Sequence, residues 1–106
     1  MNLKTILDTL GYPVAYDHFN TSTATPFIVY RRFASDNFSA DNKVYKKFNN
    51  YYIELYTAEK SPSIEEALEN LLDTNEIYYE VESEEFIQDE KVYEIMYSIS
   101  LEEEGD

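Results

Sequence analysis

Residues 51–72 have the sequence YYIELYTAEKSPSIEEALENLL, and this stretch decides the fold. Its first part alternates with the period of a β-strand, so its side chains divide between the two faces of a sheet. The two sets are Tyr51, Ile53, Leu55 and Thr57 on one face, and Tyr52, Glu54, Tyr56 and Ala58 on the other. A strand followed at once by an amphipathic helix is typical of a core in which a helix packs on a sheet.

The helix is expected to begin in the sequence SPS at residues 61–63. Pro62 suits the first helical position, where the missing N–H costs nothing. Either Ser61 caps this start, or Ser63 forms a capping box with Glu66. The helical period predicts a face toward the sheet, made of Ile64, Ala67, Leu68, Leu71 and Leu72, and a face toward water, made of Glu65, Glu66, Glu69 and Asn70.

Length and composition limit the class of protein. The chain has 106 residues, 43% of them hydrophobic, so we expect a single compact domain over residues 1–106. No apolar run approaches the roughly 18 residues of a membrane span, and residues 1–4 do not begin a signal peptide, so no membrane association is expected. The absence of cysteine excludes disulfides and fits a reducing cytoplasm. Two glycines are too few for a phosphate-binding loop.

The charge is strongly acidic and unevenly distributed. The net charge of −14 disfavours ordinary binding to a nucleic-acid backbone. Residues 1–53 hold six Lys or Arg and four Asp, a net +2. Residues 54–106 hold two Lys and eighteen Asp or Glu, a net −16. The two halves therefore carry opposite charge, which is the most informative electrostatic feature of the sequence.

The remaining segments supply a second helix and four further strands. A short helix near residues 3–10 has Asn2 as its cap and Gly11 as its stop. Strand patterns occupy residues 14–19, 27–33, 77–85 and 91–102. The last strand places Tyr93, Ile95, Tyr97 and Ile99 on the face that should pack against Leu68 and Leu72.

These elements give the order α-β-β-β-α-β-β. We predict an α+β domain with a mixed or mainly antiparallel sheet and with its helices on one face. The two strands that flank the second helix should be parallel if they share the sheet, because that helix is a crossover connection.

Residues 35–50 are expected to form a loop. The sequence SDNFSADN at residues 35–42 is polar and turn-forming. The basic residues 43–50 lack a clear pattern, and they are either the return leg of the loop or the early part of the central strand. We predict that this loop is mobile in the free protein and becomes ordered on assembly, with Phe38 as an apolar contact to a neighbouring subunit. Residues 103–106 form an acidic tail.

The sequence offers little for catalysis or metal binding. His18 is the only histidine, which excludes a His-based triad and a two-histidine metal site. The carboxylates and amides within residues 36–42 miss the spacing of a calcium loop and suit a solvated turn. Glutamates alternate over residues 80–85, as expected on the wet face of a strand. We therefore expect a protein that is not an enzyme and that has no cofactor and no metal.

Aromatic and basic residues favour a protein contact instead. The chain has eleven tyrosines, and Tyr52, Tyr56 and Tyr78 lie on faces opposite the aliphatic ones. Such a face either contacts a partner, where Tyr is enriched, or is a second packed face covered by the first helix. The candidate interface residues, from the tyrosines, the basic cluster and the Glu-rich strand, are Arg31, Arg32, Phe38, Lys43, Lys46, Lys47, Tyr52, Tyr56, Tyr78, Glu80, Glu82 and Glu84.

Several segments in this order resemble one family. They are GYPVAYDHF at 11–19, PFIVY at 26–30, DNF at 36–38, ADNKVY at 40–45, IELYT at 53–57 with Lys60, and IMY at 95–97. Together they resemble the small tail-completion, or tail-terminator, proteins of long-tailed phages and prophages of Gram-positive bacteria.

The resemblance implies a structural protein of the virion without catalysis or cofactor. The subunit would assemble with itself as a ring, a hexamer in this family, cap the finished tail tube and join it to the head–tail connector protein. DNA would pass through the channel without specific binding. The protein would reside in the tail or neck of the virion, and in the host cytoplasm during assembly.

A nucleic-acid mimic is the alternative. A small and very acidic protein can occupy the basic groove of a DNA-binding enzyme and inhibit it. The acidic second half would then be the active surface. Arg31, Arg32 and the lysines of residues 43–47 argue against a uniform mimic.

Overall fold

The computed structural model describes the backbone of residues 2–40 and 43–103 and the side chains of residues 2–34 and 48–102. Its elements are α1 (Leu3–Asp8), β1 (Val14–Tyr16), β2 (Phe27–Ala40), β3 (Lys43–Thr57), α2 (Pro62–Thr74), β4 (Tyr79–Ile87) and β5 (Val92–Glu103). The predicted order α-β-β-β-α-β-β and the α+β class are confirmed. The first strand is shorter than expected, because Asp17 takes a left-handed backbone conformation (φ +67°) that ends it.

The five strands form one mixed sheet in the order β1-β2-β3-β5-β4. β1 is parallel to β2, and every other neighbouring pair is antiparallel. Since β3 and β4 are both antiparallel to β5, they are parallel to each other. The crossover through α2 therefore has the direction predicted from the sequence.

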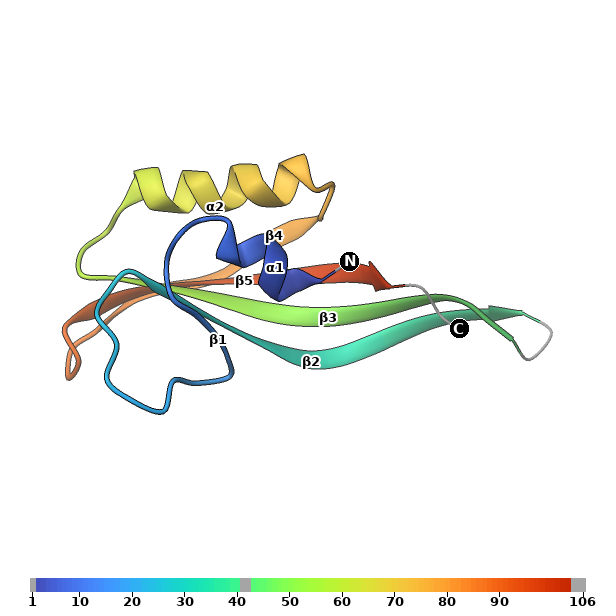
Figure 1. The fold of residues 1–106 in the computed structure, drawn as a ribbon, viewed down its shortest axis with the longest axis horizontal. Coiled ribbons are helices and arrows are strands. Elements are labelled where there is room, and N and C mark those ends of the chain that lie inside the picture. Colours follow the sequence, from blue (N-terminus) through green and yellow to red (C-terminus); the bar gives the residue numbers. More distant parts are fainter. Residues whose placement is uncertain (1, 41–42, 104–106) are drawn as a thin grey trace.

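Both helices cover the same face of the sheet (Figure 1). Cross-strand partners Ile28, Leu55 and Ile95 form one row of this core, and Leu68 and Leu72 of α2 pack on it. The other buried apolar residues are Leu3, Leu7, Val29, Ile53, Ile77, Tyr97, Ile99 and Leu101, of which Val29 lies outside the cluster that the helices cover. The prediction that β5 packs in one core with Leu68 and Leu72 is confirmed for Ile95, Tyr97 and Ile99, whereas Tyr93 lies outside that cluster.

The helix starts agree only in part with the predictions. Asn2 caps α1 as expected, because its side-chain oxygen accepts a hydrogen bond from the Thr5 backbone N–H at 3.2 Å. Ser61 is the N-cap of α2. Its side chain makes no hydrogen bond to the backbone of α2, all of whose residues the structure describes. Ser63 lies inside α2, so the alternative capping box at Ser63 is wrong.

The water-facing side of α2 was also assigned wrongly at two positions. Glu65 is buried and Ala67 is exposed, the reverse of the prediction. Glu65 is drawn inward by Lys60, whose Nζ donates to its Oε1 at 2.7 Å. Glu69 is partly buried because it accepts hydrogen bonds from Tyr79 and Tyr97. Lys60 in the connection before α2, and two tyrosines of the sheet, therefore draw inward two glutamates that helical periodicity places in water.

Residues 35–40 form a strand in place of the predicted loop, and residues 43–50 take the alternative in which they begin the central strand. β2 and β3 pair continuously from Phe27 opposite Tyr56 to Ala40 opposite Lys43, with two register shifts. β5 runs beside β3 as far as Lys47, so Glu103 of the predicted tail ends a strand, and residues 104–106 lie outside the described part. The backbone N–H and C=O groups of these polar residues form hydrogen bonds with the partner strand. Local turn propensity does not predict this pairing.

The part of the β2–β3 hairpin at residues 34–40 and 43–50 is called the hairpin arm below. It projects beyond the helices at one end of the molecule, whose longest extent is 51 Å (Figure 1). Its ordering on assembly stays a prediction.

Candidate functional site

The face of the sheet opposite the helices is the candidate functional surface, here called the open face. Side chains alternate along each strand, so residues next to core positions point to this face. Three rows of cross-strand partners form its centre: Phe27, Tyr56 and Glu94; Val29, Glu54 and Met96; and Arg31, Tyr52 and Ser98. Tyr52 and Tyr56 lie there as predicted. The alternative that α1 covers these tyrosines is wrong, because α1 packs on the aliphatic face.

Aromatic pairs give the open face its shape. Phe27 and Tyr56 stack with ring centroids 4.8 Å apart, and Phe33 and Tyr52 stack at 4.1 Å. The Arg31 guanidinium lies 4.9 Å from the centroid of Tyr52. Stacked rings and a ring-bound guanidinium form a flat surface that is partly apolar, the composition found at protein contacts.

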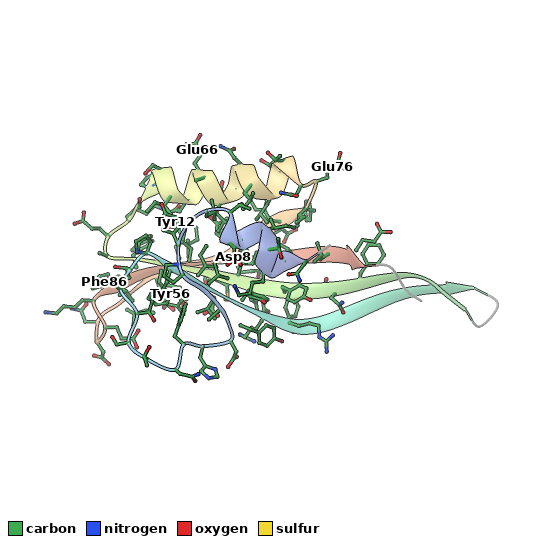
Figure 2. The ribbon with its side chains drawn as sticks, in the orientation of Figure 1. Asp8, Tyr12, Tyr56, Glu66, Glu76 and Phe86 are labelled. Carbon is green, nitrogen blue, oxygen red and sulfur yellow. The ribbon has the colours of Figure 1, made fainter. Side chains whose placement is uncertain are left out.

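One end of the open face is hollowed. The loop of residues 17–26 hangs on this side of the sheet (Figure 1) and encloses a hollow of about 600 Å³. Phe27, Glu54 and Tyr56 line the hollow from the sheet, the loop contributes Asp17, His18 and Phe19, and Glu90 lines it from the turn before β5. Tyr56 is labelled in Figure 2 on the side of the sheet where this loop lies.

Two carboxyl groups interact beside the hollow. Glu94 is only 8% exposed, and its neighbours on β3 are Glu54 and Tyr56. The Tyr56 hydroxyl donates to Glu54 Oε2 at 2.9 Å. Burial, together with the negative charge of Glu54, raises the pKa of Glu94 above its usual value. Burial and hydrogen bonds to both carboxylates likewise raise the pKa of the Tyr56 hydroxyl.

One cation lies near this pair. Arg31 Nε is 3.9 Å from Glu54 Oε1, too far for a hydrogen bond but close enough for attraction.

The predicted charge patches lie at opposite margins of the sheet. Arg31 and Arg32 are on β2 just past the end of β1, which pairs only with residues 28–30. Glu80, Glu82 and Glu84 are on β4, the edge strand at the other margin. The structure therefore separates Arg31 and Arg32 from the β4 glutamates by the two strands β3 and β5.

The acidic candidates have intramolecular partners. Glu84 accepts hydrogen bonds from Lys60 and from Tyr93, each at 2.9 Å, and these two groups lower its pKa. Glu80 accepts from the exposed Tyr78 at 2.7 Å, and Glu82 accepts from Ser98 at 2.6 Å. Glu84 is thus the candidate most strongly held by its own chain.

The backbone of Phe38, Lys43, Lys46 and Lys47 belongs to the hairpin arm. Their side chains lie outside the described residues, so their predicted contacts are not placed.

The described residues provide no assembled metal site and no membrane helix. His18 is exposed, with its Nδ1 2.9 Å from Asp17 Oδ2, and no group of three or more described His, Asp or Glu is arranged to hold a metal ion. No helix in the same part of the chain is long and apolar enough to cross a membrane.

The sequence prediction missed Glu94 and the hollow. Glu94 lies between Tyr93 and Ile95, so strand alternation predicts that it points to the polar side of β5. Alternation does not predict that this side chain is buried. The hollow depends on the loop of residues 17–26, whose path is not periodic. The signal that was available is Phe19, an aromatic residue next to an otherwise polar loop.

Comparison with known proteins gave no relative: no protein-family model matches the chain, and neither does any curated protein.

Proposed function

We propose that this protein is a structural subunit of a long-tailed phage or prophage, which assembles into a ring that caps the tail tube and joins it to the head connector. The observation that carries the proposal is the position of the charged patches. A closed ring requires a heterologous contact, in which two different patches of one subunit meet around the circle. Arg31 and Arg32 at one margin of the sheet, and the β4 glutamates at the other, are two such patches.

The open face supports the same proposal. Charged margins orient an encounter, whereas affinity comes from desolvated apolar and aromatic contacts. Phe33 is 42% exposed and stacks on Tyr52, next to the start of the hairpin arm. A neighbouring subunit that covered Phe33 and Tyr52 would exclude water from them. This pair would then form the apolar centre of the contact, which the charged margins do not provide.

The acidic excess suits a channel for DNA. Carboxylates that are not used between subunits would repel the phosphates of the passing duplex and prevent specific binding. The tail tube protein and the connector protein would meet the two flat sides of the ring.

Electron microscopy of the purified protein, alone and mixed with tail tubes, tests the proposal. The expected result is a ring with a central channel that binds one end of each tube. A protein that remains monomeric and leaves both tube ends bare would overturn the proposal.

The second candidate is an acidic nucleic-acid mimic, favoured by the exposed glutamates at positions 80, 82 and 85 of β4. A mimic would stay a monomer or dimer and would inhibit a DNA-binding enzyme stoichiometrically. The molecular mass in solution, measured by light scattering, separates the two candidates.

A further inference from the structure

The hollow on the open face has an excess of negative charge. Asp17, Glu54 and Glu90 line it, and His18 is the only lining residue with a basic side chain. His18 is already next to Asp17, and Arg31 reaches only the outer oxygen of Glu54 at 3.9 Å. Glu54 also accepts a hydrogen bond from the Tyr56 hydroxyl, which is neutral. A cation that entered the hollow would therefore still meet more carboxylates than cations.

Aromatic rings form one wall of the same hollow. Phe19 meets Phe27 edge to face at 5.4 Å, and Phe27 stacks on Tyr56 at 4.8 Å. Val29 and Val92 add apolar surface. A flat ring wall beside carboxylates suits a guanidinium, which stacks on aromatic faces and forms paired hydrogen bonds with carboxylates.

The open face already holds one arginine in this way. The Arg31 guanidinium lies over Tyr52 and faces Glu54, which combines a ring contact and a carboxylate contact. Phe27 and Tyr56 place a second aromatic pair beside the same Glu54, on the side of the hollow. The molecule thus contains one occupied arrangement of ring, carboxylate and guanidinium next to a hollow lined by the same types of group.

We propose that the hollow binds an arginine side chain carried by an extended segment of a partner protein. Charge complementarity selects a cationic partner, and the flat aromatic wall selects arginine over lysine. The hollow has a volume of about 600 Å³ and is open to solvent on one side, so an extended segment can cross it while its arginine enters. The inference does not depend on whether the chain forms a ring.

Binding has a direct electrostatic consequence. A guanidinium next to Glu54 and Tyr56 adds a positive charge close to Glu94. It stabilises the ionised form of Glu94 and so lowers the pKa of that carboxyl from its raised value. A change in the pKa of Glu94 therefore reports binding in the hollow and not binding elsewhere on the acidic surface.

Titration of the full chain with the peptide acetyl-Gly-Arg-Gly-amide, followed by NMR, tests the proposal. We expect saturable shifts centred on Phe27, Glu54 and Tyr56, together with a lower pKa of Glu94 at saturation. The citrulline peptide, which is similar in shape but neutral, should produce neither effect, and the lysine peptide should bind more weakly.

Matched variants locate the site. Glu54→Gln should weaken binding of the arginine peptide about tenfold, the loss expected for one charged hydrogen bond. Glu66→Gln removes the same charge on the outer side of α2 (Figure 2) and should leave binding unchanged. Glu90→Gln, at an exposed position of the hollow, should also weaken binding, and it decides the question if Glu54→Gln fails to fold.

Four results would overturn the proposal. The first is equal binding of the citrulline peptide or of the lysine peptide. The second is a loss of affinity in Glu66→Gln as large as in Glu90→Gln. The third is displacement of the peptide by Mg²⁺ or Ca²⁺ at lower concentration, which would make the hollow a cation site. The fourth is concentration-dependent shifts of the hollow without peptide, which would make a second copy the occupant.

Discussion

The Tyr97 hydroxyl of β5 donates a 2.7 Å hydrogen bond to Glu69 Oε2 of α2, which fastens the helix to the sheet through a buried tyrosine. The other oxygen of Glu69 accepts from Tyr79 of the edge strand β4 at 3.3 Å. One carboxylate thus joins the helix to two strands. Burial and the hydrogen bond to Glu69 raise the pKa of Tyr97, so the phenol remains the donor at neutral pH.

Tyr97→Phe should lower the free energy of unfolding by about 1.5–3 kcal/mol, because it removes a hydrogen bond to a charged group inside the structure. Urea unfolding measures the change. Tyr78→Phe is the matched control, since Tyr78 is 71% exposed and the loss of its hydroxyl should leave the free energy of unfolding nearly unchanged. Equal losses in both variants would show that the contact to Glu69 contributes nothing.

Leu68→Ala should lower the free energy of unfolding by about 2–5 kcal/mol, because Leu68 is fully buried between α2 and the sheet. Glu66→Ala on the exposed side of the same helix should change stability by less than about 0.5 kcal/mol. A loss near zero for Leu68→Ala would contradict the assignment of this residue to the core.

The element order was predictable because the apolar pattern changes period sharply at residues 57–61. Ile53 and Leu55 alternate as in a strand, and Leu68 and Leu72 recur as in a helix, and all four are buried. The errors on α2 fall where a glutamate has a partner outside the helix, which is Lys60 for Glu65 and two tyrosines for Glu69. Glu69 lies 10 and 28 residues from the tyrosines that bond to it, a separation that local periodicity does not contain.

The hairpin arm was missed for a related reason. The sequence SDNFSADN at residues 35–42 has strong turn propensity, but its residues 35–40 form a strand because they pair with β3. The open face was more accessible to prediction, since Tyr52 and Tyr56 follow directly from alternation. The hollow was not, because it arises where Asp17 turns the chain back over the sheet.

Glu94→Gln should stabilise the protein at neutral pH. The folded state raises the pKa of Glu94, so the native protein binds more protons than the unfolded chain at pH values above the reference of 4.5. Stability is therefore lost as the pH rises through this window. Gln removes the cost of an ionised buried carboxyl, and the gain should shrink as the pH falls below 4.5.

Chemical unfolding of both proteins from pH 4 to pH 7 measures this difference. Glu84→Gln is the control with the opposite sign, because Lys60 and Tyr93 lower the pKa of Glu84 and its contribution is lost as the pH falls. A Glu94→Gln protein that is less stable than the wild type at neutral pH would show that the charged form is favoured.

Arg32→Glu should yield a folded subunit that assembles poorly. Arg32 is exposed at the β2 margin, whereas Arg31 faces Glu54 and is better left intact. The reversed charge would repel the β4 glutamates of the next subunit, and like charges at a contact slow encounter. Sedimentation velocity should show a smaller ring fraction, and added salt should slow wild-type assembly because it screens exposed charges.

Two further variants make this test specific to the proposed contact. Lys91→Glu changes the net charge equally at an exposed position in the turn before β5, and it should assemble as the wild type does. Glu80→Arg should fail to assemble alone, whereas the double variant Arg32→Glu with Glu80→Arg should recover rings, because the two charges are exchanged and not lost. If Arg32→Glu forms rings at the wild-type rate, the contact between opposite margins of the sheet is wrong, even if the rings themselves cap tail tubes.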